Sequence, residues 1–198
     1  IFELNKFTEI EKHHLRYPDH LIVCSNWARN IVENEIGRLA TVIPLGIDRS
    51  IFNPARYQQQ NSNKNPDKTI FLNCGKWEYR KGHDILHEIF NKAFGPNDSV
   101  ELWMMCHNPF LTKEETRAWQ KLYLDTPLGQ AGKIKFVGPF ANHYEVASVM
   151  FQVDCGIFPS RAEGWNLEAL ELMSMGKHII ITDYSGHTEF CTSDNSLL

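Results

Sequence analysis

The sequence lacks the patterns that mark several common classes of protein. It has no apolar run near the ~18 residues that a membrane-spanning helix needs, and no signal-peptide pattern at its start. Its formal net charge of -4 gives no basic field for a nucleic acid or an acidic membrane surface. The five cysteines form no Cys-x-x-Cys pair, and such an odd, scattered set is typical of buried thiols in a reducing compartment. We therefore expect a cytoplasmic protein with no transmembrane segment and no nucleic acid partner.

Two glycine-rich nucleotide motifs are also missing. Neither Gly-x-Gly-x-x-Gly nor Gly-x-x-x-x-Gly-Lys-Ser/Thr occurs, which disfavours dinucleotide-binding and P-loop domains. There is no Asp-x-Asp motif and no cluster of histidine and cysteine at metal-ligand spacing. We therefore expect neither a metal nor a cofactor. The hydrophobic fraction of 42% is that of a globular protein, and this length is enough to bury a sizeable core.

The last two thirds of the chain alternate between short apolar runs and helical patterns. We predict strands at 69–75, 99–105, 133–138, 154–159 and 178–183, and helices at 82–94, 112–124, 142–152 and 166–176. This alternation predicts an α/β fold, a doubly wound parallel sheet with helices on both faces.

The first third of the chain has a weaker pattern. We predict an amphipathic helix at 1–15, a strand at 20–25, a helix at 26–36 with Asn26 as its N-cap, and a strand at 40–46. Residues 47–66 have no period and are rich in Asn, Gln and Pro, which indicates a linker. We therefore divide the chain into residues 1–46, the linker at 47–66 and a lobe at 67–198, and expect it to be a piece of a longer protein.

The loops after the predicted strands are the candidate ligand site, because parallel sheets bind ligands at the carboxyl ends of their strands. These loops are 75–82, 106–111, 138–142, 159–166 and 183–188. The first, GKWEYRKG, carries Lys76, Arg80 and Lys81 between two glycines and precedes a helix. Such a turn suits a phosphate or diphosphate. The alternative is three solvated cations, and we expect Arg80 in particular to be solvated.

The stretch RAEGWNLEALE at 161–171 holds three glutamates, and two of them, Glu163 and Glu171, have different expected surroundings. Glu163 lies in a loop, where a carboxylate can accept hydrogen bonds from sugar hydroxyls, and Glu171 lies in a helix, where it can accept two from a diol. Asn166 can cap that helix or adopt a positive φ. The alternative is that Glu163 and Glu168 only complement the helix dipole while Glu171 pairs with a lysine.

Three further positions near these loops have less distinct patterns. Gly186, in SGHTEF at 185–190, would leave backbone amides free near the same edge of the sheet, unless the segment is a plain turn into a short helix. We interpret His83 and His143 as solvated loop histidines and assign neither a catalytic role.

Three stretches, in this order, resemble the group 1 family of retaining glycosyltransferases, which have the two-lobed GT-B architecture with Rossmann-like lobes. VIPLGIDRSIF (42–52) is similar to the segment between the lobes, and GKWEYRKGHDIL (75–86) to the Gly-Arg-x4-Lys-Gly stretch. PSRAEGWNLEALELMSMGKHIIITD (159–183) is similar to the Glu-x7-Glu motif with its trailing small-residue helix and Met-Gly-Lys turn. The resemblance implies a donor lobe plus the end of an acceptor lobe, and transfer of a hexosyl group from a nucleotide sugar without a metal.

The resemblance also implies a role for individual residues. Glu171 would bind the ribose diol and Glu163 the transferred sugar, while Lys76 and Lys81 would neutralise the leaving diphosphate. The other implied donor-binding positions are Gly75, the backbone of Gly164, Trp165, Asn166 and Leu167 around the diphosphate and sugar, and Gly138 and Pro139 near the nucleobase. The sequence departs from the family where Lys76 replaces an arginine and Asn166 a glycine.

Other functions stay open. A GT-B relative such as a phosphorylase or a sucrose-synthase-like enzyme is one, and a module that binds a nucleotide sugar without turnover is another. The sequence does not distinguish UDP, GDP and ADP, the hexoses, or a glycan, lipid or small-molecule acceptor. Because acceptor contacts in this family lie mostly in the first lobe, we expect this chain to bind a nucleotide sugar weakly and to transfer nothing detectable by itself.

Overall fold

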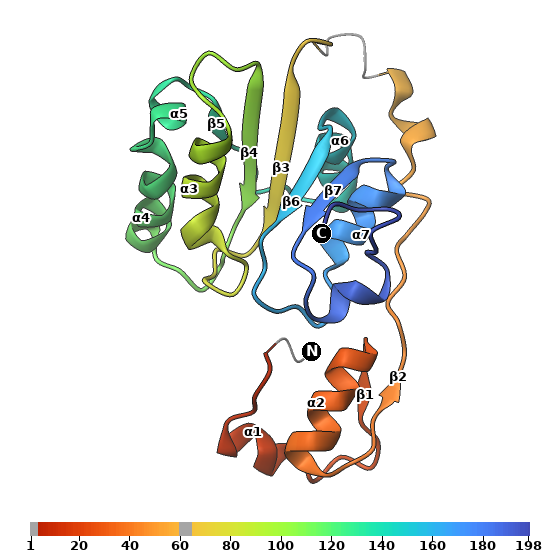
Figure 1. The fold of residues 1–198 in the computed structure, drawn as a ribbon. Helices are drawn as coiled ribbons and strands as arrows, with labels where there is room; N and C mark the ends of the chain where they lie inside the picture. The colour runs from red at the N-terminus through yellow and green to blue at the C-terminus, as the bar shows by residue number, and fades with distance from the viewer. Residues whose placement is uncertain (1–3, 60–64) are drawn as a thin grey trace.

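The structure, a computed structural model, describes residues 4–59 and 65–198, and its main feature is a parallel sheet of five strands (Figure 1). In chain order its elements are β3 (Thr69–Gly75), α3 (His83–Ala93), β4 (Val100–Cys106), α4 (Lys113–Leu124), α5 (Pro127–Gln130), β5 (Ile134–Phe136), α6 (His143–Gln152), β6 (Cys155–Phe158), α7 (Leu167–Ser174) and β7 (His178–Ile181). The predicted doubly wound α/β fold is therefore confirmed. The sequence did not predict α5, a helix of four residues that begins with a proline and is capped by Thr126.

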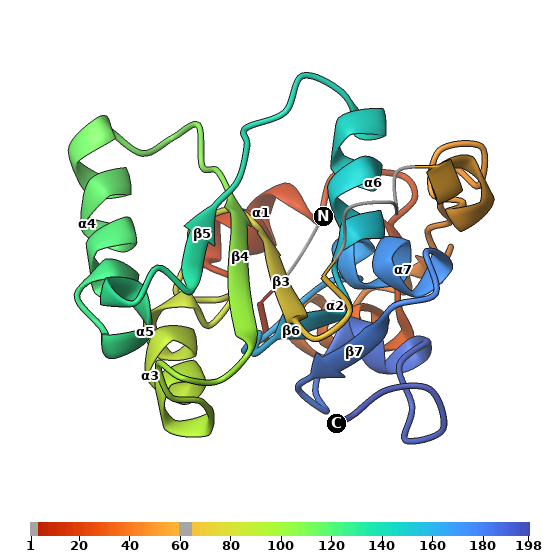
Figure 2. The same cartoon turned by 90° about the horizontal axis from the view of Figure 1, so that it is seen from above.

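All strands are parallel, and their order is β5-β4-β3-β6-β7, so the side on which successive strands are added changes once. The chain moves outward from β3 to β5 and then returns to the other side of β3 for β6 and β7. Helices α3, α4 and α5 cover one face of the sheet and α6 and α7 the other, as Figure 2 shows. The loops that leave β3 and β6 therefore turn toward opposite faces, and a crevice opens between them at the carboxyl edge of the sheet.

Each face of the sheet has its own hydrophobic core. Leu72, Met150 and Leu172 belong to the core under α6 and α7, and Leu86 and Leu102 belong to the core under α3 and α4; all five are 0% exposed. Burial on both faces explains why the strands read as continuous apolar runs. The edge of this sheet is consequently a rigid base for the loops that it carries.

The amino-terminal region is a smaller α/β unit of α1 (Glu9–His14), β1 (Ile22–Val23), α2 (Asn26–Ile36) and β2 (Thr41–Val42). The predicted helix at 1–15 is too long, because Thr8 caps α1 in a capping box with Glu11. The predicted N-cap of α2 is also wrong: the Ser25 hydroxyl accepts from the amide of Ala28 at 3.1 Å. The core of this unit is small and consists of Phe7, Leu21, Val32 and Ala40.

A polar contact between Asn26 and Glu189 joins the amino-terminal region to the region of the large sheet. The backbone N and the Nδ2 of Asn26 donate to the two carboxylate oxygens of Glu189, at 2.7 and 2.9 Å. Glu189 ends the 3-10 helix η3 (Gly186–Glu189), which follows β7. Beside this contact Trp27 packs edge-on against Tyr184, with ring centroids 5.9 Å apart. Asn26 therefore lies in the first turn of its helix and binds the other lobe.

The predicted linker is partly ordered against the large sheet. It contains the 3-10 helix η1 (Pro54–Arg56), and Phe52 and Tyr57 are buried in the core under α6 and α7. The Ser174 hydroxyl donates to the carbonyl of Phe52 at 2.7 Å. Residues 60–64 of the predicted linker lie outside the described residues.

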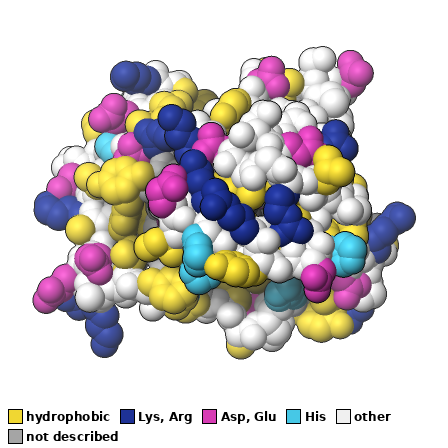
Figure 3. Space-filling model, turned by 90° about the horizontal axis from the view of Figure 1, so that it is seen from below, with side chains coloured by type: hydrophobic (Ala, Val, Ile, Leu, Met, Phe, Trp, Pro, Cys, Tyr) yellow, Lys and Arg dark blue, Asp and Glu magenta, His cyan; other side chains and the backbone are white. Residues whose placement is uncertain are grey.

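Other sequence predictions concern the surface and the thiols. All five cysteines are free, and Cys74, Cys155 and Cys191 are buried. Among the helices that the structure describes, none combines the length and the apolar character needed to cross a lipid bilayer. On the face seen from the amino-terminal side, Lys and Arg side chains form a band between hydrophobic ones (Figure 3). The exposed hydrophobic residues of the amino-terminal unit include Ile22 at 64% and Leu39 at 86%.

Candidate functional site

The loops after β3 and β6 meet at the carboxyl edge of the sheet, as the sequence predicts. The Nζ of Lys81 lies 3.0 Å from a carboxylate oxygen of Glu163, although 82 residues separate them. A backbone hydrogen bond from the amide of Arg161 to the carbonyl of Arg80, 2.7 Å long, holds the two loops together. Basic and acidic side chains from distant parts of the chain thus form one cluster.

Glu163 is the centre of this cluster and is only 1% exposed. Its carboxylate accepts from Arg80 at 2.7 Å, from Lys81 at 3.0 Å and from the hydroxyl of Ser160 at 3.0 Å. Its backbone amide donates to the Ser185 hydroxyl at 2.8 Å. Burial alone would raise the pKa of Glu163, but the charges of Lys81 and Arg80 reverse this and lower it, so that the group is ionised at neutral pH.

Arg80 is not solvated, contrary to the sequence prediction. Its side chain is 11% exposed and forms ion pairs with Glu163 and, at 2.9 Å, with Glu78. It also donates to the carbonyl of Ala162 at 2.8 Å. A planar guanidinium presents several donors in a fixed fork, which suits three acceptors on two loops. Sequence reasoning missed this residue because its main partner lies 83 residues away.

The two lysines of the basic loop have different surroundings. Lys81 is 6% exposed and lies 3.2 Å from a carboxylate oxygen of Glu168 in addition to its contact with Glu163. Burial would lower the pKa of Lys81, but the charges of Glu168 and Glu163 hold it above its usual value. Lys76 is 46% exposed on its side chain and pairs with Glu78 at 3.3 Å. Of the two, Lys81 is therefore the one fixed by buried contacts.

Glycine is needed at two positions to bring these loops together. Gly82 has a φ of 74°, and a Cβ there would lie 2.1 Å from the carbonyl oxygen of Pro159 on the other loop. Gly75 has a φ of 137°, and its Cβ would lie 2.8 Å from Cδ of Lys81. A side chain at either position would displace the cation cluster.

The amino end of α7 points into the same cluster. Asn166 caps this helix with a φ of 74°, its side-chain oxygen accepting from the amide of Ala169 at 3.2 Å. Both sequence predictions for Asn166 are thus confirmed, since asparagine tolerates the left-handed region better than most residues. Its Nδ2 and the indole nitrogen of Trp165 are buried without a hydrogen-bond partner among the described residues.

Two adjoining hollows lie around this helix end. The first, here called the charged hollow, has a volume of about 330 Å³. Its lining comprises Leu45, Lys76, Arg80, Lys81, Glu163, Trp165, Asn166, Leu167, Glu168 and Glu171. It unites most of the predicted site residues. Leu45, from the segment between the two regions, was not predicted.

The second, here called the apolar hollow, has a volume of about 270 Å³. Its lining comprises Cys74, Gly75, Met105, Cys106, His107, Val137, Pro139, Phe140, Val146, Met150, Glu168 and Glu171. The predicted residues Gly75 and Pro139 line it, and Gly138 joins Pro139 through a cis peptide. The two hollows share Glu168 and Glu171, so those carboxylates stand at the boundary between them.

Glu171 differs from the other carboxylates of the cluster. In the part of the chain that the structure describes, no ion pair joins it to a lysine, so the alternative interpretation of Glu171 is not supported. Burial, and then the charge of Glu168, raise the pKa of Glu171 to about 7. Glu168 does lie in the first turn of α7, as the helix-dipole alternative requires.

The remaining candidates have structural partners. His83 is 0% exposed, so its interpretation as a solvated residue is wrong: Nδ1 accepts from the amide of Glu78 at 3.1 Å, and Nε2 bonds Asn73 at 2.8 Å. Burial, then the charge of Lys81, lower its pKa to about 3. The Gly186 amide is not free, since it donates to the carbonyl of Glu163 at 2.8 Å. Gly186 is the first residue of the short 3-10 helix η3. His143 is the exposed first residue of α6.

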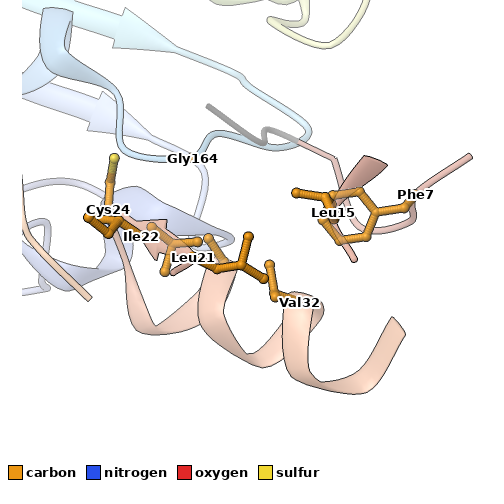
Figure 4. A pocket seen from close by; sticks show the side chains of 9 residues that line it. Phe7, Leu15, Leu21, Ile22, Cys24, Val32 and Gly164 are labelled. Atoms are coloured by element: carbon orange, nitrogen blue, oxygen red, sulfur yellow. The ribbon is translucent and has the colours of Figure 1, made fainter. Parts of the chain in front are cut away.

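A third hollow of about 190 Å³ lies between the two regions. Figure 4 shows Leu21, Ile22, Cys24 and Val32 on one side of it, Phe7 and Leu15 on another, and Gly164 from the loop after β6. This apolar surface of the amino-terminal unit therefore faces the loop that carries Glu163. No group of three or more His, Cys, Asp and Glu side chains arranged for a metal ion occurs within residues 4–59 and 65–198.

A doubly wound parallel sheet with a crevice at the point where its strand order reverses is an architecture of proteins that bind nucleotides. The family model described as "Glycosyl transferases group 1" matches residues 68–198. The chain therefore belongs to this family of glycosyltransferases.

Solved structures have the same fold. Sucrose-phosphate synthase from Thermosynechococcus elongatus superposes with a TM-score of 0.80 at 24% identity, over 96% of this chain and 47% of that one. A glycosyltransferase from Rickettsia africae ESF-5 gives 0.75 at 16% identity, over 98% and 54%. The C-terminal domain of a group 1 glycosyl transferase from Francisella tularensis gives 0.59 at 26% identity, over 77% and 80%. This chain spans about half the length of the first two. No curated protein matches its sequence.

Proposed function

We propose that this chain forms the donor side of a retaining glycosyltransferase, which transfers a hexosyl group from a nucleoside diphosphate sugar to an acceptor not yet identified. One observation carries the proposal: Lys81 and Arg80 meet the amino end of α7 in the charged hollow, and the apolar hollow with Glu171 adjoins it. A nucleotide sugar needs three kinds of surroundings side by side: an apolar site for the base, a carboxylate for the ribose diol and positive charge for the phosphates.

The lining residues support an assignment of each part of the donor. The apolar hollow, with Met105 and Pro139, suits a nucleobase. Glu171 at its boundary suits the ribose hydroxyls. Lys81, with Lys76 at the more exposed end, suits the diphosphate, and the helix dipole of α7 adds to the same field. These groups supply positive charge where the leaving diphosphate develops negative charge, so the proposed mechanism includes no metal ion.

We propose two roles for Glu163, contact with the transferred sugar and positioning of the neighbouring cations. The resemblance implies a contact with the transferred sugar, and this contact stays a prediction. The buried ion pairs of Glu163 support a positioning role as well, because its carboxylate orients both Arg80 and Lys81. Preorganised charges of this kind need no rearrangement when the leaving group forms.

The principal test is binding of UDP-, GDP- and ADP-hexoses to the 198-residue chain, measured by saturation-transfer NMR, together with a transfer assay. We expect one nucleotide to bind and no transfer to be detectable, because transfer holds donor and acceptor together in a closed cleft and this chain spans about half of its solved relatives. Absence of binding by every nucleotide sugar would refute the proposal. In a longer protein with a full acceptor lobe, NMR of the anomeric proton should show retention, and a chelator should leave activity unchanged.

The rival within the same fold is an enzyme of another reaction type, such as a phosphorylase or a sucrose-synthase-like enzyme. Similarity to a sucrose-phosphate synthase over 96% of this chain keeps that rival open. Release of hexose 1-phosphate with inorganic phosphate, or reversal of transfer by a nucleoside diphosphate, would favour the rival. Binding without transfer even in a longer protein would favour a module that only binds nucleotide sugars.

A further inference from the structure

The charged hollow is close to electrically neutral, which is unexpected for a site that is to hold a diphosphate. The cations that line it, Lys76, Arg80 and Lys81, face three lining carboxylates, Glu163, Glu168 and Glu171. Among the described residues these cations form ion pairs with Glu163, Glu168 and the adjacent Glu78. Each cation already has at least one negative partner. A diphosphate that enters must therefore displace a carboxylate or bind to a site without net attraction.

The three carboxylates differ in how easily they can be displaced. Glu163 has a side chain that is 2% exposed and is held by two cations and the hydroxyl of Ser160. Glu168 has a side chain that is 29% exposed and forms its ion pair with Lys81. Of the two carboxylates on Lys81, Glu168 is the more exposed, and Glu163 stays paired with Lys81 when Glu168 leaves. Glu168 is therefore the carboxylate that an anion can displace most easily.

The position of Glu168 coincides with the place where phosphate binding is expected. It lies in the first turn of α7, where the helix dipole favours a negative charge. Its carboxylate also lies on Lys81, the most deeply buried cation of the cluster, and at the boundary of the two hollows. Glu168 therefore satisfies both sources of positive charge that a diphosphate would use.

We propose that the carboxylate of Glu168 substitutes for a donor phosphate in this structure, and that it leaves Lys81 when a nucleoside diphosphate binds. Glu168 thereby sets the affinity of the site for diphosphates. This inference rests on the proposed function, since it requires the diphosphate to bind at Lys81. It adds a residue that lowers affinity for the donor and for the nucleoside diphosphate product alike.

Lowered affinity has a consequence for turnover. The nucleoside diphosphate left after transfer carries more negative charge than the bound donor did, so a cleft with an uncompensated cation would retain it. The Glu168 carboxylate competes for Lys81 at that stage and favours release. Because product release limits many enzymes, an internal competitor of this kind keeps the site from being blocked.

The test is isothermal titration of the 198-residue chain with UDP, GDP and ADP and with the corresponding nucleosides. It is done at about pH 8.5, where Glu171, with a pKa of about 7, is ionised with or without Glu168. Glu168→Gln should tighten binding of the preferred diphosphate by about twofold to fivefold, the upper part of the range for an ion pair with a partly exposed partner. Nucleoside affinity should stay the same.

Two control variants separate the contact from a general effect of charge. Glu88→Gln removes one negative charge from an exposed position on α3, away from the hollows, and should leave diphosphate affinity unchanged. Glu168→Asp keeps the charge but shortens the side chain, so it should also tighten binding. If Glu168→Asp binds like the wild type while Glu168→Gln binds more tightly, the effect is one of long-range charge and the inference is wrong.

The outcomes also distinguish this inference from the proposed function. If the wild type binds a diphosphate and Glu168→Gln does not bind it more tightly, only the role of Glu168 is refuted. If neither chain binds any of the three diphosphates, while thermal unfolding shows that both are folded, the donor site itself is refuted.

Discussion

The two hollows at the carboxyl edge of the sheet differ in whether their charged side chains are paired. In the charged hollow the cations and carboxylates are paired, and the pairing lowers the pKa of Glu163 and raises that of Lys81. Glu171, at the boundary with the apolar hollow, is a half-buried carboxylate that forms no ion pair with a cation of the described residues, and its pKa rises to about 7. Pairing therefore fixes the charges of one hollow over a wide pH range, whereas the charge of the other changes near neutral pH.

The largest effect expected from this comparison is that of Lys81. We expect Lys81→Met to weaken nucleoside diphosphate binding by about 1.5–3 kcal/mol, the range for a hydrogen bond to a charged group, or about 12- to 150-fold. Nucleoside binding should change little, because Lys81 lines only the charged hollow. Titration calorimetry with both ligands measures this. An equal loss for nucleoside and diphosphate would mean that Lys81 supports the structure of both hollows.

The second effect concerns Glu171 and the diol. Glu171→Ala should weaken nucleotide binding by about 1–3 kcal/mol, because two hydroxyls lose a charged acceptor. A 2′-deoxy nucleotide should bind more weakly than its ribonucleotide to the wild type, yet equally to the variant. The same penalty for the 2′-deoxy ligand in both proteins would exclude contact between Glu171 and the ribose.

The third effect is a pH dependence of nucleoside binding. A diol needs the ionised form of Glu171, so nucleoside affinity should fall as the pH drops below about 7. At about pH 6 the loss should be roughly tenfold, because one pH unit below the pKa about a tenth of the group is ionised. Titrations with a nucleoside avoid the titration of the phosphates themselves.

Glu171→Gln is the matched variant for this pH dependence, and its nucleoside affinity should not vary over the same interval. The raised pKa of Glu171 also affects the stability of the protein without ligand, and there the free energy of unfolding changes with pH in the opposite direction to nucleoside affinity. The folded state holds the proton of Glu171 more tightly than an unfolded chain with the ordinary value of 4.5, so this group makes the free energy of unfolding fall as the pH rises from 4.5 to about 7. A constant nucleoside affinity in the wild type would contradict the raised pKa.

The smallest effect is expected at Lys76. Its side chain is 46% exposed and pairs with Glu78, so Lys76→Ala should weaken diphosphate binding by no more than about 1 kcal/mol. The loss should disappear when the salt concentration is raised, since an exposed charge is screened. The binding constants of both proteins at low and high salt measure it. A loss as large as that of Lys81→Met would show that exposure does not separate the two lysines.

The sequence predicts the large sheet well because each of its elements has a local pattern. The five strands lie within two residues of their predicted ends, since strands buried on both faces are continuous apolar runs. Asn166 is predicted correctly for the same reason: capping and a positive φ are local properties of one residue. The burial of Arg80 and His83 is not predictable in this way. Arg80 owes it to Glu163, 83 residues away, and His83 to Asn73 on the neighbouring strand.

The contact between Asn26 and Glu189 limits how the amino-terminal unit can move. That unit is joined to the large sheet covalently through the segment after β2, which Figure 1 shows as a single extended strand of chain, and non-covalently through Glu189. Trp27 packs against Tyr184 beside this second joint. A displacement that keeps both joints intact is a rotation about the line that connects them. The apolar side chains that face Gly164 then follow an arc rather than a straight path, so the cleft opens as an angle whose vertex lies on that line.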